Sequence, residues 1–173
     1  MEITWFTESN AKIVFKQLIG IVESCHDRGV MHRDIKLENI FLFTEENDQC
    51  PDIRLGNFGF ATYIKPAEKL HKACGSLYYI APEMLDRNPV YDQAVDVWSA
   101  GVVLFSFLSG NPSFDGETDS HIINNIKDGA FCFDVFEWAN ISELAKDMIS
   151  GMLYKDPAKR LTATKVLNHP WMK

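Results

Sequence analysis

The sequence predicts a mainly α-helical protein of the α+β class, with short strands in its first third. Apolar residues recur at steps of three and four over several long stretches, which is the spacing of helices. Two short apolar runs within residues 40–55 have the length and setting of strands. At 173 residues and 46% hydrophobic, the chain can bury a substantial core, so we expect residues 1–173 to form a single domain.

The first predicted helix lies within residues 7–29. Glu8 suits the positive end of the helix dipole, Thr7 or Ser9 can cap the start, and Gly29 is the expected stop. The apolar positions that give the helical spacing are Ala11, Val14, Phe15, Leu18, Ile21, Val22 and Cys25.

The rest of the chain alternates polar loops with apolar stretches. Residues 40–43 and 53–55 are expected to form two strands joined by a polar loop. Residues 56–83 show no strong periodicity, and a long irregular segment inside a compact domain is usually functional. Four more helices are predicted, with Ser142 and Thr162 as caps of the last two. They cover residues 94–109, 121–128, 142–154 and 162–168.

The formal charge of −7 argues against a nucleic-acid partner, because neutralising phosphates takes clustered Lys and Arg. A basic protein or peptide partner suits this charge better. The most apolar stretch, residues 95–108, is interrupted by Asp96, Ser99 and Ser106 and is shorter than the ~20 residues that a membrane span needs, so no membrane association is expected. The N-terminus lacks secretory and myristoylation features, which indicates a cytoplasmic location and allows a nuclear one.

Residues 32–39, His-Arg-Asp-Ile-Lys-Leu-Glu-Asn, carry the densest group of reactive side chains. Phosphoryl transfer needs a carboxylate near the attacking hydroxyl, a cation on the transferred phosphate, and oxygen ligands for magnesium. Asp34 can supply the carboxylate, Lys36 the cation and Asn39 a neutral oxygen. Eight residues in this order, just after a helix, resemble the catalytic loop of the eukaryotic protein kinases.

A second motif of that family follows at residues 56–59, Gly-Asn-Phe-Gly. It resembles the Asp-Phe-Gly motif, with Asn57 where the metal-binding Asp stands. An amide is a weaker ligand than a carboxylate for a hard cation, so magnesium coordination by Asn39 and Asn57 is expected to be weakened. Phe58 and Gly59 are expected to act in packing and in the turn, with Phe58 against the first residue of the loop.

Architectural motifs extend the resemblance. Residues 81–83 match the Ala-Pro-Glu motif, which would close an activation segment spanning 57–83. In the family Glu83 pairs with an Arg, here Arg160, and Asp96 ties the catalytic loop to a helix. The residues that the resemblance makes structural are His32, Arg33, Phe58, Gly59, Glu83, Asp96 and Arg160.

Three stretches make the chain similar to the plant-type calcium-dependent protein kinases of the calmodulin-dependent group. This resemblance covers essentially the whole chain and implies a Ser/Thr protein kinase that uses ATP and magnesium. The stretches are residues 65–69, 75–83 and 167–173.

The same resemblance assigns roles to individual residues. Ser76 would bridge Asp34 and Lys36 and favour Ser or Thr acceptors. Glu38 would meet an Arg upstream of the phosphorylated residue. Phe41 would form the floor beneath the adenine. The nucleotide and metal residues would be Lys36, Asn39, Phe41 and Asn57.

The sequence also departs from the family. No Gly-rich loop, Val-Ala-Ile-Lys lysine or partner Glu occurs before residue 32, so we expect a C-terminal lobe without the N-lobe. Where related kinases carry a phosphorylated Thr, residues 71–73 are His-Lys-Ala, so phosphorylation there cannot activate the chain.

Three functions therefore stay open. The chain is a weakly active or inactive Ser/Thr kinase, a pseudokinase-like module that binds substrates or partners, or a non-functional truncated kinase product. A kinase or regulatory partner would cover the apolar cleft face.

Overall fold

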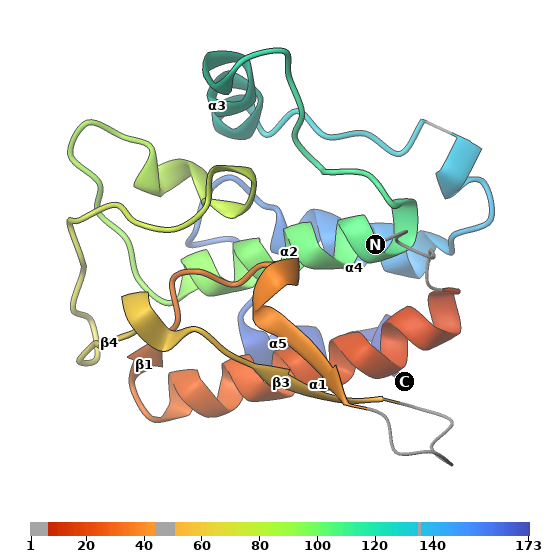
Figure 1. Ribbon diagram of the computed structural model, residues 1–173, viewed down its shortest axis with the longest axis horizontal. Coiled ribbons are helices and arrows are strands. Elements are labelled where there is room, and N and C mark those ends of the chain that lie inside the picture. Colours follow the sequence, from red (N-terminus) through yellow and green to blue (C-terminus); the bar gives the residue numbers. More distant parts are fainter. Residues whose placement is uncertain (1–6, 44–50, 135) are drawn as a thin grey trace.

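The computed structural model describes residues 7–43, 51–134 and 136–173. The fold is mainly helical, as predicted, and α1 and α2 pack against each other with α4 and α5 beside them (Figure 1). The α-helices are α1 (Glu8–Asp27), α2 (Ala94–Ser109), α3 (Asp119–Asp128), α4 (Glu143–Met152) and α5 (Ala163–Leu167). Short 3₁₀ helices are η1 (Leu37–Asn39), η2 (Phe58–Phe60), η3 (Leu77–Tyr79), η4 (Pro82–Met84), η5 (Phe136–Trp138) and η6 (Pro170–Met172).

The first helix, α1, begins and ends as the sequence predicts. The Thr7 side chain caps its start by accepting a hydrogen bond from the backbone N–H of Asn10 at 3.2 Å, so Thr7 and not Ser9 is the cap. Gly29 follows its end with φ +69°, and a Cβ there would lie 2.9 Å from the Ile64 carbonyl oxygen. Only glycine combines that conformation with so close an approach, which lets the chain turn directly into the next strand.

The central helix, α2, is buried over almost its whole length and matches the predicted range. It is buried on all sides because α1, α4, η3 and η5 pack around it. Trp98 stacks on Phe114 with ring centroids 5.4 Å apart. The helix α3 lies on the side of α2 away from α1 (Figure 1). Within the described residues, no helix is long and apolar enough to cross a membrane.

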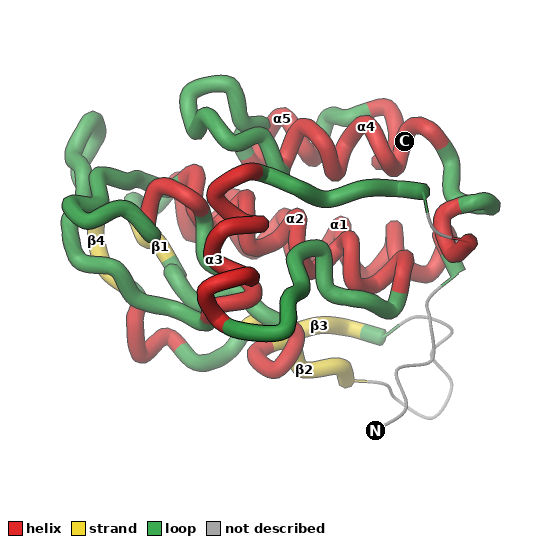
Figure 2. The backbone as a smooth tube through the Cα atoms, turned by 90° about the horizontal axis from the view of Figure 1, so that it is seen from above, coloured by secondary structure: helices red, strands yellow, loops and turns green. Residues whose placement is uncertain are grey.

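In the part of the chain that the structure describes, two small antiparallel sheets lie beside the helices. The predicted strands form one of them, β2 (Ile40–Phe43) and β3 (Asp52–Leu55), in the register Ile40↔Leu55 (Figure 2). The second sheet, β1 (Val30–Met31) with β4 (Thr62–Tyr63), was not predicted. Two-residue strands have no periodicity to detect, and their pairing is fixed by the chain that leaves Gly29 and meets Ile64.

The remaining α-helices differ from prediction by one or two residues at their ends. Ser142 and Thr162 cap α4 and α5 through their side-chain oxygens, as expected. The helix α3 begins at Asp119, two residues earlier than expected, because the Thr118 side chain accepts from the backbone N–H of His121 and caps it.

Candidate functional site

The carboxylate of Asp96, on α2, fixes the backbone of the 32–39 loop. It accepts hydrogen bonds from the backbone N–H groups of His32 at 2.9 Å and Arg33 at 2.8 Å. A third hydrogen bond, at 2.9 Å, joins it to Nε2 of His26 on α1. Asp96 is 1% exposed, so a buried carboxylate makes these charge-assisted bonds, and they hold Arg33 at a positive φ of 66°.

The His32 ring joins the loop to residues 56–59. Its Nδ1 accepts from the backbone N–H of Asp34 at 3.3 Å, so the ring proton belongs on Nε2, which donates to the Gly56 carbonyl at 2.9 Å. The ring also packs edge-on against Phe58, with centroids 4.7 Å apart. The contact between Phe58 and the loop that we expected is therefore present.

Three of the predicted site residues meet in one network. The Ser76 hydroxyl donates to Asp34 Oδ1 at 2.9 Å, and Lys36 Nζ donates to Ser76 Oγ at 2.7 Å. Lys36 Nζ also lies 3.6 Å from Asp34 Oδ2. Gly75, at φ +102°, allows this approach, because a Cβ there would lie 2.7 Å from the Arg33 carbonyl oxygen. Asp34, 4% exposed, is thus a buried carboxylate already bonded to a hydroxyl and facing a cation.

The two predicted metal ligands contact each other. Asn39 Nδ2 donates to the Asp34 carbonyl at 2.7 Å and to Asp34 Oδ2 at 3.1 Å. Asn39 Oδ1 accepts from Asn57 Nδ2 at 3.3 Å. Both candidate ligands are neutral amides, and the Asn39 oxygen already has a donor, so this donor set does not fit magnesium. Across residues 7–43, 51–134 and 136–173, no three His, Cys, Asp or Glu side chains form a group that could hold a metal.

Phe41 and Glu38 lie at the margin of the network. Phe41, on β2 and 50% exposed, lies so close to Gly56 that a Cβ there would be 2.6 Å from its ring. Glu38 is exposed and lies near Tyr79. Burial, together with the negative charge of Glu38, raises the pKa of Tyr79 to about 12, so its hydroxyl stays protonated.

The predicted structural pair of Glu83 and Arg160 is present and buried. The two guanidinium nitrogens donate to the two carboxylate oxygens at 2.7 and 2.9 Å. The Arg160 side chain is 0% exposed, also donates to the Ala94 carbonyl, and lies over the Trp98 ring at 5.0 Å. This pair links η4 to α2 and to the segment between α4 and α5.

Arg33 reaches the 57–83 segment both directly and through Tyr91, a residue to which the sequence did not point. Its guanidinium donates to the Phe60 carbonyl at 2.7 Å and to the Tyr91 hydroxyl at 3.1 Å. Tyr91 in turn donates to the Lys72 carbonyl at 2.5 Å, and its backbone pairs with Leu70. Lys72 therefore meets this cluster through its backbone carbonyl. The sequence did not point to His26 either, because Tyr91 and His26 belong to no motif.

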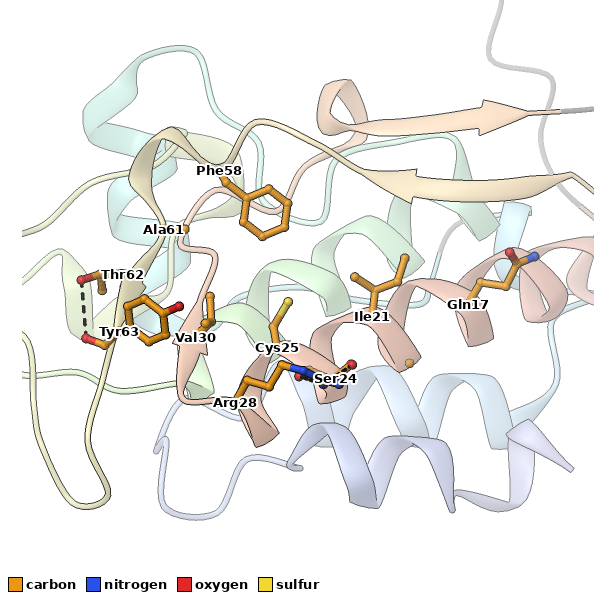
Figure 3. A pocket seen from close by; sticks show the side chains of 11 residues that line it. Gln17, Ile21, Ser24, Cys25, Arg28, Val30, Phe58, Ala61, Thr62 and Tyr63 are labelled. Atoms are coloured by element: carbon orange, nitrogen blue, oxygen red, sulfur yellow. Dashed lines mark hydrogen bonds between the residues drawn. The ribbon is translucent and has the colours of Figure 1, made fainter.

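A groove of about 670 Å³ runs beside this network, between α1 and the chain after residue 57 (Figure 3). Phe58 contributes to both, since its ring contacts His32 and lines the groove. The groove is lined by both polar and apolar residues. They are Gln17, Gly20, Ile21, Ser24, Cys25, Arg28, Val30, Phe58, Ala61, Thr62 and Tyr63.

Comparison with known proteins agrees with this arrangement. Residues 2–172 match the protein kinase domain family. Calcium-dependent protein kinase 29 of Arabidopsis thaliana is 44% identical over 96% of this chain and 30% of its own length. Calcium-dependent protein kinase 28 of Oryza sativa subsp. japonica is 43% identical over 96% of this chain and 31% of its own length. The chain thus spans about a third of the length of these relatives. It belongs to the protein kinase family and has the fold of that family's C-terminal lobe.

Proposed function

We propose that this lobe binds the Ser or Thr hydroxyl of a protein substrate at Asp34, and that its phosphoryl transfer from ATP is weak. The hydrogen bond from Ser76 to Asp34 carries this proposal. In this bond the Asp34 carboxylate accepts from an aliphatic hydroxyl of the chain itself, with Lys36 beside it to balance charge, which supports the same role toward a substrate hydroxyl. The likeness to calcium-dependent protein kinases supports the same reaction class.

Weak phosphoryl transfer is expected from the residues at the metal positions, Asn39 and Asn57. ATP with magnesium is the cofactor that the family implies, but the amides of Asn39 and Asn57 do not fit the metal. Phosphoryl transfer depends almost entirely on positioning and on neutralising charge on the phosphates. A site that keeps the carboxylate for the hydroxyl and lacks the metal carboxylate is expected to bind better than it catalyses.

The substrate segment is expected to be basic. The chain carries a formal charge of −7, and Glu38 is exposed close to the Asp34 network. A guanidinium upstream of the acceptor hydroxyl would pair with the Glu38 carboxylate in two parallel hydrogen bonds. This pairing would orient the peptide toward Asp34.

Calorimetric titration with a peptide that carries Arg upstream of a single Ser tests substrate binding. Glu38→Gln is expected to weaken binding about tenfold, since it removes one charge-assisted pair worth about 1.4 kcal/mol. Glu117→Gln, an equivalent change at an exposed position on another surface, serves as the control. Equal affinity of all three proteins, or no saturable binding by any of them, would refute the assignment.

Transfer is tested separately, with radiolabelled ATP and the same peptide. Incorporation that disappears in Asp34→Asn supports a weak kinase. Incorporation that persists in Asp34→Asn would rule out Asp34 as the residue that accepts the hydroxyl proton.

A second candidate is a pseudokinase-like module that binds a partner without transfer. The large apolar side chains of β2 and η2 favour it, because they are exposed on the same part of the chain as the site motifs. A kinase or regulatory partner would cover them, and peptide binding without any phosphate incorporation would distinguish this function from the first. These side chains are Phe41, Leu42, Phe43, Phe58 and Phe60.

A further inference from the structure

We propose that the Asn57 amide takes the place of the cation at this site, so that the folded lobe completes its hydrogen bonding without magnesium and excludes it. This goes further than weakened coordination, because it assigns Asn57 a positive structural role. It concerns the same side chains as the proposed function but does not require that a peptide binds there. The argument starts from the orientation of two amide groups.

The orientation of the Asn39 amide is fixed by Asp34. The carbonyl and carboxylate oxygens of Asp34 can only accept, and one Asn39 atom lies 2.7 and 3.1 Å from them. That atom must therefore be the donor Nδ2. The opposite side of the amide, Oδ1, is left facing Asn57.

An acceptor facing position 57 requires a donor there. Asn57 supplies one, since its Nδ2 lies 3.3 Å from Asn39 Oδ1. An aspartate at position 57 would present an oxygen to this oxygen, and the two facing oxygens would repel each other unless a cation or a proton lay between them. The amide hydrogen of Asn57 thus occupies the place that a shared cation would fill.

Magnesium would have to displace this hydrogen bond to bind. It would gain two neutral oxygens in return, whereas it normally requires at least one carboxylate before it gives up water. Asp34 offers no simple replacement. Its Oδ1 accepts from Ser76, and its Oδ2 accepts from Asn39 and lies beside the Lys36 ammonium group.

The backbone at position 57 suits the variants that test this inference. Asn57 has φ 60°, in the left-handed region, which Asn, Asp and Gly all adopt more readily than other residues. The neighbouring residues are held independently, by the bond from His32 to the Gly56 carbonyl and the packing of Phe58 on His32. Asn57→Asp and Asn57→Gly are therefore expected to fold.

The experiment measures thermal unfolding of the whole chain with increasing magnesium chloride at constant ionic strength, with and without ATP as the nucleotide probe. The wild type and Asn57→Gly are expected to show no magnesium-dependent rise of the midpoint. Asn57→Asp is expected to unfold at a lower temperature than the wild type in EDTA and to recover with magnesium. Calorimetric titration with magnesium chloride is expected to give an affinity for Asn57→Asp at least about tenfold above that of the wild type.

Asn140→Asp, at an exposed position between η5 and α4, controls for adding a carboxylate anywhere on the surface. Saturable stabilisation of the wild type by magnesium would overturn the inference, because the amide pair would then admit the cation. A response of Asn57→Asp no larger than that of Asn140→Asp would overturn it too, since residue 57 would not be what excludes the metal. Neither result depends on whether a peptide binds.

Discussion

The Asp96→Asn variant tests whether one buried carboxylate holds the 32–39 loop in place. Asp96 accepts three hydrogen bonds, from the backbone of His32 and Arg33 and from the His26 ring. An amide can keep the acceptor on one side only, and its NH₂ group would face the donors on the other. Breaking a buried charged network of this kind costs about 3–5 kcal/mol. At about 2–4 °C per kcal/mol for a chain of this size, the unfolding midpoint is expected to fall by about 6–20 °C.

The assay is thermal and urea unfolding followed by circular dichroism, with Asp86→Asn as the matched exposed control. The control is expected to stay within about 0.5 kcal/mol of the wild type. Hydrogen exchange adds a local measurement, because the amides of His32 and Arg33 lose their acceptor and are expected to exchange faster. A loss below about 1 kcal/mol with unchanged exchange at these two amides would refute the view that Asp96 fixes the loop.

Three further predictions concern stability. Burial alone would raise the pKa of Glu8, but the hydrogen bonds from Ser142 outweigh burial and hold this pKa below its ordinary value of 4.5. A carboxyl with a depressed pKa stabilises the fold at pH values above its ordinary pKa, and that stability is lost as the pH falls through the folded pKa. Glu8→Gln is therefore expected to cost under about 1 kcal/mol at neutral pH and nothing in strong acid. An equal cost at both pH values would contradict this. Glu83→Ala strands the buried charge of Arg160 and is expected to cost about 3–5 kcal/mol in urea unfolding, whereas a near-neutral result would mean that the pair is not desolvated. Tyr91→Phe removes a hydroxyl that bonds Arg33 and the Lys72 carbonyl and is expected to cost about 1–2 kcal/mol by the same measurement; no change would show that water replaces it.

Much of the fold could be predicted because its helices carry local signals. The range of α2 was obtained from its sequence alone, and the caps Thr7, Ser142 and Thr162 mark the starts of three other helices. The strands β1 and β4 could not be predicted, since two residues define no period and their pairing joins distant parts of the chain.

The candidate site also contains residues that the sequence predicts and residues that it does not. Asp34, Lys36 and Asn39 were recognisable because they lie within eight residues of one another, and the structure brings Ser76 to them. The partners that hold the loop come from elsewhere. His26 lies 70 residues from Asp96, and its role depends on how α1 packs against α2. Such contacts are products of tertiary packing, which spacing in the sequence does not encode.

The two halves of the site differ in how firmly the fold holds them. Asp34 and Asn39 are buried, and Asp34 belongs to a loop that is bonded to the central helix through Asp96. Asn57 is exposed and, among the residues that the structure describes, joins the network through one hydrogen bond between side chains. A change at Asn57 therefore costs about 1 kcal/mol, whereas a change at Asp96 costs several out of a total of about 5–15 kcal/mol. Asn57 can therefore change at little cost while the protein stays folded, whereas loss of the Asp96 carboxylate removes a large share of the stability that holds the Asp34 loop. The proposed binding of a substrate hydroxyl without magnesium is thus compatible with the stability of this fold.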